Sequence, residues 1–108
     1  MLNQTVLVGR LVRDPELYET ESGNKVTNIT LAVPRSYKNS NGEYDTDFIN
    51  CVLWKGIAES ASEYCHKGDL LGVKGRIQTR VIELDDETHK NITEVVAEKV
   101  TYLSSKKD

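Results

Sequence analysis

Turn-forming residues divide this chain into short segments in which apolar and polar side chains alternate, and this pattern limits the fold more than any other feature. Proline at Pro15 removes a ladder donor and ends the first segment, and the polar loop 38–42 returns the chain after the second. Several short strands separated by turn residues are typical of an all-β domain. The expected strands are residues 3–12, 26–37, a third run that ends near 55, 69–82 and 92–103.

One helix is expected, over residues 56–67. Apolar side chains recur there at i, i+4, i+7 and i+8, which gives one apolar face, and Gly68 follows as a C-terminal stop. The helix would lie between the third and fourth strands. Five strands with a helix in this position match the OB-fold, a partly open Greek-key barrel. The residues of the apolar face are Ile57, Ala61, Tyr64 and Cys65.

Length and composition fit one domain. The chain has 108 residues, of which 38% are hydrophobic, and we expect a domain over 1–104 with a short polar end at 105–108. No apolar run approaches the roughly 18–20 residues of a membrane span. The N-terminus lacks the basic and then apolar pattern of a signal peptide. The sequence therefore predicts a cytoplasmic protein.

The cysteine and histidine residues give no sign of a disulfide framework or of a metal site. Cys51 and Cys65 could form a disulfide, but buried free thiols in a reducing compartment are the better interpretation. His66 and His89 are not spaced from other ligand residues as zinc sites require. We expect no metal and no other cofactor.

The third strand carries two large aromatic side chains out of phase with its aliphatic residues. Side chains alternate between the two faces of a strand, so Ile49, Cys51 and Leu53 are expected on the core side and Phe48 and Trp54 on the other. Aromatic residues in strands are most often core residues. Outward aromatics, however, can stack on nucleic-acid bases without reading sequence. Their phase favours this second interpretation.

The fourth strand places positive charge on one face. Gln78 shares this face, and no acid interrupts it within the strand, whereas Val73, Ile77 and Val81 point the other way. A solvated strand face is the alternative interpretation, but such a row can also follow a phosphate backbone. We call this row the cationic stripe: Lys74, Arg76 and Arg80.

Other candidate binding residues lie at strand ends. Tyr37 stands between Arg35 and Lys38, Arg10 is near the end of the first strand, and Lys55 follows Trp54. The net charge of −3 alone argues against a nucleic-acid partner. Many acids, however, cluster in two loop segments, 14–21 and 83–87, so a positive surface can coexist with a negative total.

Six segments together resemble the bacterial single-stranded DNA-binding protein family over residues 2–104. The resemblance implies an OB-fold protomer, assembled as a homotetramer, that wraps single-stranded DNA near the nucleoid during replication, recombination and repair. The segments are LVGRL at 7–11, DPEL at 14–17, NITLAV at 28–33, DFINCVLW at 47–54, KGDLLGVKGRIQTR at 67–80 and TEVVAEKV at 93–100.

Tyr37, Phe48 and Trp54 occupy positions that resemble three stacking aromatics of the family. Ile82 and Asn91 stand where aromatics are usual, which weakens the loop between the last two strands as a stacking site. The sequence shows no Gly/Pro/Gln-rich linker with an acidic tip. It is either a shortened form of a tailed protein or a tailless paralogue, and we expect no tail-mediated recruitment of partner proteins by this chain. An OB-fold that serves as a protein-interaction adaptor is an alternative. No catalytic constellation is present, so an enzyme is not expected.

Overall fold

The computed structural model describes residues 1–105, and the rest of the predicted polar end, 106–108, lies outside the described residues. Within the described residues, no helix is long and apolar enough to cross a membrane. The elements are β1 (Thr5–Leu11), β2 (Tyr18–Glu19), β3 (Lys25–Lys38), β4 (Tyr44–Trp54), α1 (Lys55–Tyr64), β5 (Leu70–Glu83) and β6 (His89–Ser104).

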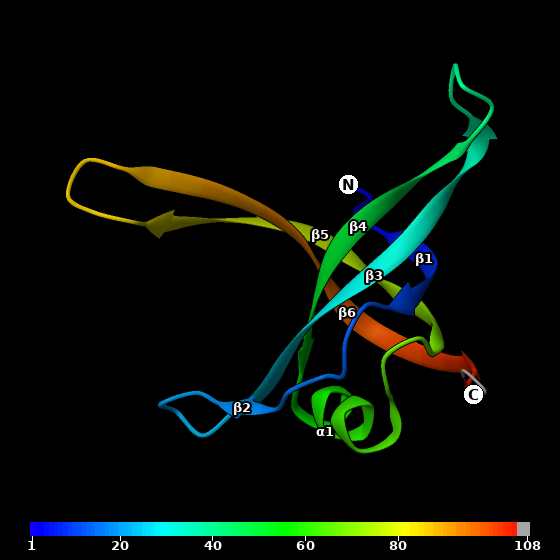
Figure 1. Cartoon of the computed structure of the whole chain (residues 1–108). Coiled ribbons are helices and arrows are strands. Elements are labelled where there is room, and N and C mark those ends of the chain that lie inside the picture. Colours follow the sequence, from blue (N-terminus) through cyan, green and yellow to red (C-terminus); the bar gives the residue numbers. More distant parts are fainter. Residues whose placement is uncertain (106–108) are drawn as a thin grey trace.

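The strands form one sheet that closes into a barrel (Figure 1). The sheet order is β1-β5-β6-β4-β3-β2, and β1 also pairs with β3, which closes the ring around five strands. Every pairing is antiparallel except that of β4 with β6, which runs through Cys51–Val95 and Val52–Val96. The all-β OB-fold prediction is confirmed. The two-residue β2 was not predicted, so α1 lies between β4 and β5 when every strand is counted.

The core is built by the inward side chains of the barrel strands. Leu31, Leu53 and Val73 are completely buried, and the prediction that Ile49, Cys51 and Leu53 share a core face is confirmed. Both cysteines are free and buried. Desolvation raises the pKa of the Cys51 thiol to about 12 and that of Cys65 to about 11, so neither is a reactive thiolate at neutral pH.

The helix ends earlier than predicted, at Tyr64 instead of 67. Cys65 is extended, and the backbone beyond it bonds to other parts of the chain. The N–H of Lys67 donates to the Asp14 carboxylate at 2.6 Å, and the N–H of Gly68 donates to the Leu11 carbonyl at 2.8 Å. These bonds to the end of β1 replace further helical turns.

The buried face of α1 also differs from the predicted one. Ala58 and Ala61 are its buried residues, whereas Tyr64 is exposed. Ile57 packs partly against the core, and Cys65 is buried just beyond the helix. The small alanine side chains let α1 approach the end of the barrel closely.

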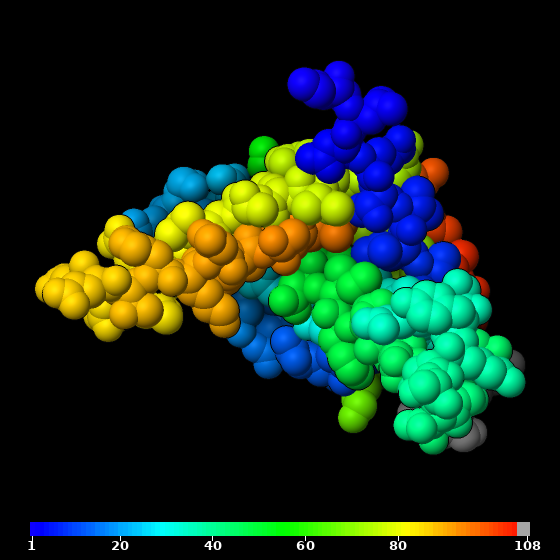
Figure 2. All heavy atoms as spheres, turned by 90° about the horizontal axis from the view of Figure 1, so that it is seen from above, coloured from blue at the N-terminus to red at the C-terminus, as the bar shows by residue number. Residues whose placement is uncertain are grey.

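Two hairpins extend beyond the barrel (Figure 1). The β3–β4 hairpin points one way, and the β5–β6 hairpin points another, with its ladder continuing to the pair Glu83–His89. This ladder explains why β6 starts three residues before the predicted 92. In Figure 2 both hairpins form lobes that stand away from the main body of the protein. Ile77 and Val81, on the inward phase of β5, are exposed because this hairpin has left the core.

Gly75 lies where the β5–β6 register shifts. A Cβ at this position would stand 2.1 Å from the carbonyl oxygen of Val96 and 3.1 Å from the Cα of Ala97. We therefore expect Gly75→Ala to lower the free energy of unfolding by about 1–3 kcal/mol or more, as overpacking does. Gly56→Ala is the matched control because a Cβ there meets nothing within 4 Å. Equal midpoints for both variants in urea unfolding would contradict this reading.

Candidate functional site

The outward face of β4 presents the two predicted aromatics. Phe48 is 67% exposed and Trp54 is 38% exposed, whereas their neighbours Cys51 and Leu53 are buried. β4 ends at Trp54 because Lys55 adopts a left-handed backbone conformation (φ 55°) that turns the chain into α1. The turn leaves Trp54 extended at the edge of the outward face.

A groove of about 280 Å³ connects Trp54 with the end of the cationic stripe. The strand register explains why Trp54 and Arg80 line the same groove. Trp54 stands opposite Val26, and Gln78 stands opposite Glu94, while the parallel β4–β6 pairing brings both pairs into one surface. Val52 is buried at the floor, although it has the outward phase. The lining residues are Val26, Asn28, Val52, Trp54, Gln78, Arg80 and Glu94.

A buried carboxylate holds Arg80 in this groove. The Glu94 side chain is only 4% exposed, and it accepts hydrogen bonds from Arg80 Nε at 3.0 Å and Gln78 Nε2 at 2.7 Å. Gln78 in turn accepts a longer bond from Arg76 Nη1 at 3.4 Å. No acid interrupts the cationic stripe along β5, as the sequence shows, but the neighbouring strand β6 supplies Glu94. Pairing across strands therefore fixes Arg80 and offsets part of its charge.

The other two stripe residues lie farther along β5. Lys74 is exposed between Val6 of β1 and Lys99 of β6, and Arg76 is exposed opposite Val96. Among the described residues, neither makes an ion pair within 4.0 Å. Their charges remain available to an anionic ligand.

Arg35 is engaged by two acids on β4. Its guanidinium lies 3.0 Å from Asp47 and 3.7 Å from Asp45. The hydrogen bond to Arg35 lowers the pKa of Asp47, and the same bond raises the pKa of Arg35. Tyr37 also acts electrostatically on Arg35, which places it near this cluster on the β3–β4 hairpin.

The remaining predicted cations are exposed on the barrel, on the β3–β4 hairpin and at the start of α1. Arg10 pairs with Ala32, whose other neighbour is Phe48, so Arg10 lies two strands from that ring. Arg10 also donates to the Gly68 carbonyl at 2.9 Å. Lys38 stands opposite Tyr44 near the hairpin turn, and Lys55 begins α1 beside Trp54.

Sequence reasoning missed two residues on this surface. Tyr18 of β2 pairs with Val26, which is the partner of Trp54, so an exposed phenol lies beyond the groove. The Tyr18 hydroxyl donates to the Glu16 carboxylate, which raises the pKa of Tyr18. A two-residue strand leaves no periodic signal. Glu94 was also missed, because its role depends on strand register.

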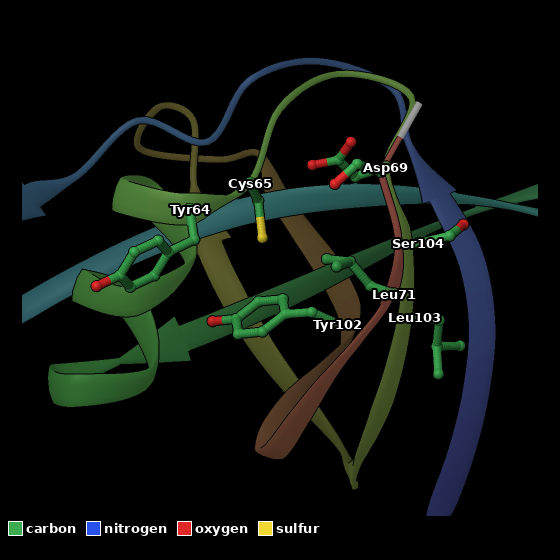
Figure 3. Close-up of a pocket in the computed structure, with 8 residues that line it drawn as sticks. Tyr64, Cys65, Asp69, Leu71, Tyr102, Leu103 and Ser104 are labelled. Carbon is green, nitrogen blue, oxygen red and sulfur yellow. The ribbon is translucent and has the colours of Figure 1, made fainter. Parts of the chain in front are cut away.

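A second cavity lies between the end of α1 and the C-terminal part of β6 (Figure 3). It measures about 350 Å³, and Tyr64 of α1 and Tyr102 of β6 flank it. Desolvation raises the pKa of Tyr102. Cys65 also lines it, but its raised pKa disfavours the thiolate. Within residues 1–105, no group of three His, Cys, Asp or Glu side chains could hold a metal ion.

Comparisons with known proteins assign the chain to a protein family. The sequence matches the model of the Single-strand binding protein family over residues 2–103. It is 48% identical to Single-stranded DNA-binding protein B of Bacillus subtilis, covering 98% of this chain and 94% of that protein. It is 52% identical to the Single-stranded DNA-binding protein of Halalkalibacterium halodurans, covering 95% of this chain but 61% of that longer relative.

Proposed function

The chain belongs to the single-strand binding protein family, and from this membership and its outward face we propose that it binds single-stranded DNA without sequence preference. It acts as a binding protein and not as an enzyme. The observation that carries the proposal is the groove in which Trp54 and Arg80 meet. Stacking surface and positive charge are the two elements that sequence-tolerant single-strand binding requires.

The aromatic side chains hold bases, and the cations follow the backbone. Every base has a π-face, so stacking on Phe48 and Trp54 does not discriminate sequence. Lys74 and Arg76 have no described acid within 4.0 Å, and they contact phosphates. The proposed DNA-binding set is Arg10, Arg35, Tyr37, Lys38, Phe48, Trp54, Lys55, Lys74, Arg76 and Arg80.

The ion pairs divide these cations into two classes. Arg80 and Arg35 are each held by acids, so they are positioned before DNA arrives and release less counterion on binding. Lys74 and Arg76 are exposed and bring their full charge. Arg80 fixes the path of the strand beside Trp54, and the second class supplies most of the salt-dependent attraction.

We also propose a homotetramer, with β1 in the subunit interface. Val6 is 68% exposed and Val8 is 49% exposed, on the outward face of β1. Gly72 lies opposite Val8, and its Cβ position is 3.6 Å from the exposed Leu103, so the apolar surface continues across β5 to β6. Exposed apolar patches of this kind mark interaction sites.

We place residues 1–104 in one binding domain that acts in replication, recombination and repair at the nucleoid.

Trp54→Ala tests stacking. We expect binding to weaken by about 1–3 kcal/mol, the value of one stacked base, with a small change in stability. Leu53→Ala, its fully buried neighbour, should cost about 2–5 kcal/mol of stability. Fluorescence anisotropy with a labelled oligothymidylate and urea unfolding measure the two effects. A Trp54→Ala protein that binds normally but unfolds like Leu53→Ala would make Trp54 a core residue.

Replacing single cations tests the path of the phosphates. The log–log salt slope of binding should fall in magnitude by about 0.7 for Lys74→Gln or Arg76→Gln, the single-strand value per contact. Arg80→Gln should change the slope less, because Glu94 already offsets part of its charge. Titrations at several salt concentrations give the slopes. If the salt slope stays unchanged when Lys74, Arg76 and Arg80 are all replaced by Gln, the cationic stripe is not part of the binding surface.

Val8→Glu tests the assembly. A carboxylate in an apolar interface costs desolvation energy, so we expect sedimentation at micromolar concentration to show species smaller than the tetramer. Leu84→Glu is the control, because Leu84 is an exposed apolar residue in the β5–β6 loop, away from β1. Wild-type protein that sediments as a monomer would overturn the proposed assembly, and a Val8→Glu tetramer would exclude β1 from its interface.

A further inference from the structure

Tyr44, the first residue of β4, lies on the same face as Phe48 and Trp54. The three rings are separated by even numbers of residues, so alternation puts them on one side of the strand. Tyr44 is 56% exposed. Four residues of extended strand separate Tyr44 from Phe48 by about 13 Å, far enough for the two rings to hold different nucleotides.

Two contacts agree with this assignment. Asp45 and Asp47 both approach the guanidinium of Arg35, which places these two side chains together on one face of β4. Tyr44 and Phe48, at the intervening phase, must therefore point to the opposite face. Lys38 stands directly opposite Tyr44 in the ladder, and its Nζ lies 5.9 Å from the centre of the Tyr44 ring.

We propose that Tyr44 and Lys38 form a further nucleotide subsite, which extends the single-stranded DNA path from Phe48 onto the β3–β4 hairpin. A base stacks on the phenol of Tyr44, and Lys38 contacts the adjoining phosphate. This inference rests on the proposed function. Among the described residues, Lys38 makes no ion pair, so no acid competes with a phosphate for it. Its ammonium lies over one face of the Tyr44 ring, so the base stacks on the other face.

The hairpin is suited to carry the subsite. It stands away from the barrel (Figure 2), so a strand can reach its surface without disturbing the core. The β3–β4 register shifts between Pro34 and Lys38, and the ion pairs of Arg35 connect the two strands across this irregular part. These contacts hold the start of β4 in a fixed orientation relative to Phe48.

The other hairpin offers no equivalent. Between residues 79 and 93 the sequence contains no Phe, Tyr or Trp, and Ile82 and Asn91 stand at the positions where the family resemblance would place aromatics. That hairpin also ends in an acidic loop, 83–87, which repels a phosphate backbone. Aromatic surface and unpaired positive charge instead occur together at Tyr44 and Lys38.

Oligothymidylates of increasing length test the subsite with the full chain. Lengths from about 4 to about 16 nucleotides span the site sizes of OB-folds. We expect Tyr44→Ala to bind the shortest oligomers like wild type and to lose about 5- to 150-fold in affinity for the longer ones, the value of one stacked base. Tyr44→Phe should bind like wild type at every length. Tyr64→Ala, which removes an exposed tyrosine from α1, is the matched control and should also be unaffected.

The outcomes separate this subsite from the proposed function. Wild-type protein that binds no oligomer of any length would overturn the proposed function itself. Normal wild-type binding with no effect of Tyr44→Ala at any length would overturn only the subsite. A loss in Tyr44→Phe as large as in Tyr44→Ala would assign the contact to the hydroxyl and reject stacking. An equal loss of affinity at all lengths would mean that even the shortest oligomers use Tyr44, and it would reject a further subsite that only longer oligomers reach.

Discussion

The register of β4 is the constraint on which the rest of the structure depends. β4 is paired on both sides, antiparallel to β3 and parallel to β6, and its inward side chains Cys51 and Leu53 are fully buried. A slip by one residue would exchange the two faces of the strand, placing Trp54 in the core and Leu53 in water. Burial of two modest side chains thus determines the direction of every aromatic ring along β4.

Charge around the sheet is balanced locally and not by the total composition. Glu94 and Asp47 each hold an arginine across a strand pair, while Lys74 and Arg76 have no acid within 4.0 Å among the described residues. A chain with a net charge of −3 can therefore present a surface attractive to an anion. Because one partner of each arginine pair is a carboxylate on a neighbouring strand, sheet register also determines which cations remain available.

Features that depend on one strand alone could be predicted from the sequence, whereas contacts that depend on the pairing of strands could not. Alternation correctly separated Leu53 from Trp54, because one buried face imposes a period of two. The partnership of Arg80 with Glu94 needs the β5–β6 register, which alternation does not supply. The helix was expected too long because its end depends on bonds from residues 67 and 68 to Asp14 and Leu11, distant in sequence. Tyr44 had the right phase but stands at the strand's first residue, where it resembles part of the turn.

The two hairpins end in loops that do not contribute to the core: residues 39–43 and 84–88. An insertion at either tip would lengthen a ladder that already lies outside the barrel, and loop closure costs only about 0.6 kcal/mol for each doubling of loop length. The same barrel can therefore accept hairpins of different length without repacking. Variation in the length of the tips would alter how many nucleotides of single-stranded DNA each protomer covers. The size of the DNA-binding site could therefore change without a change in how the barrel folds.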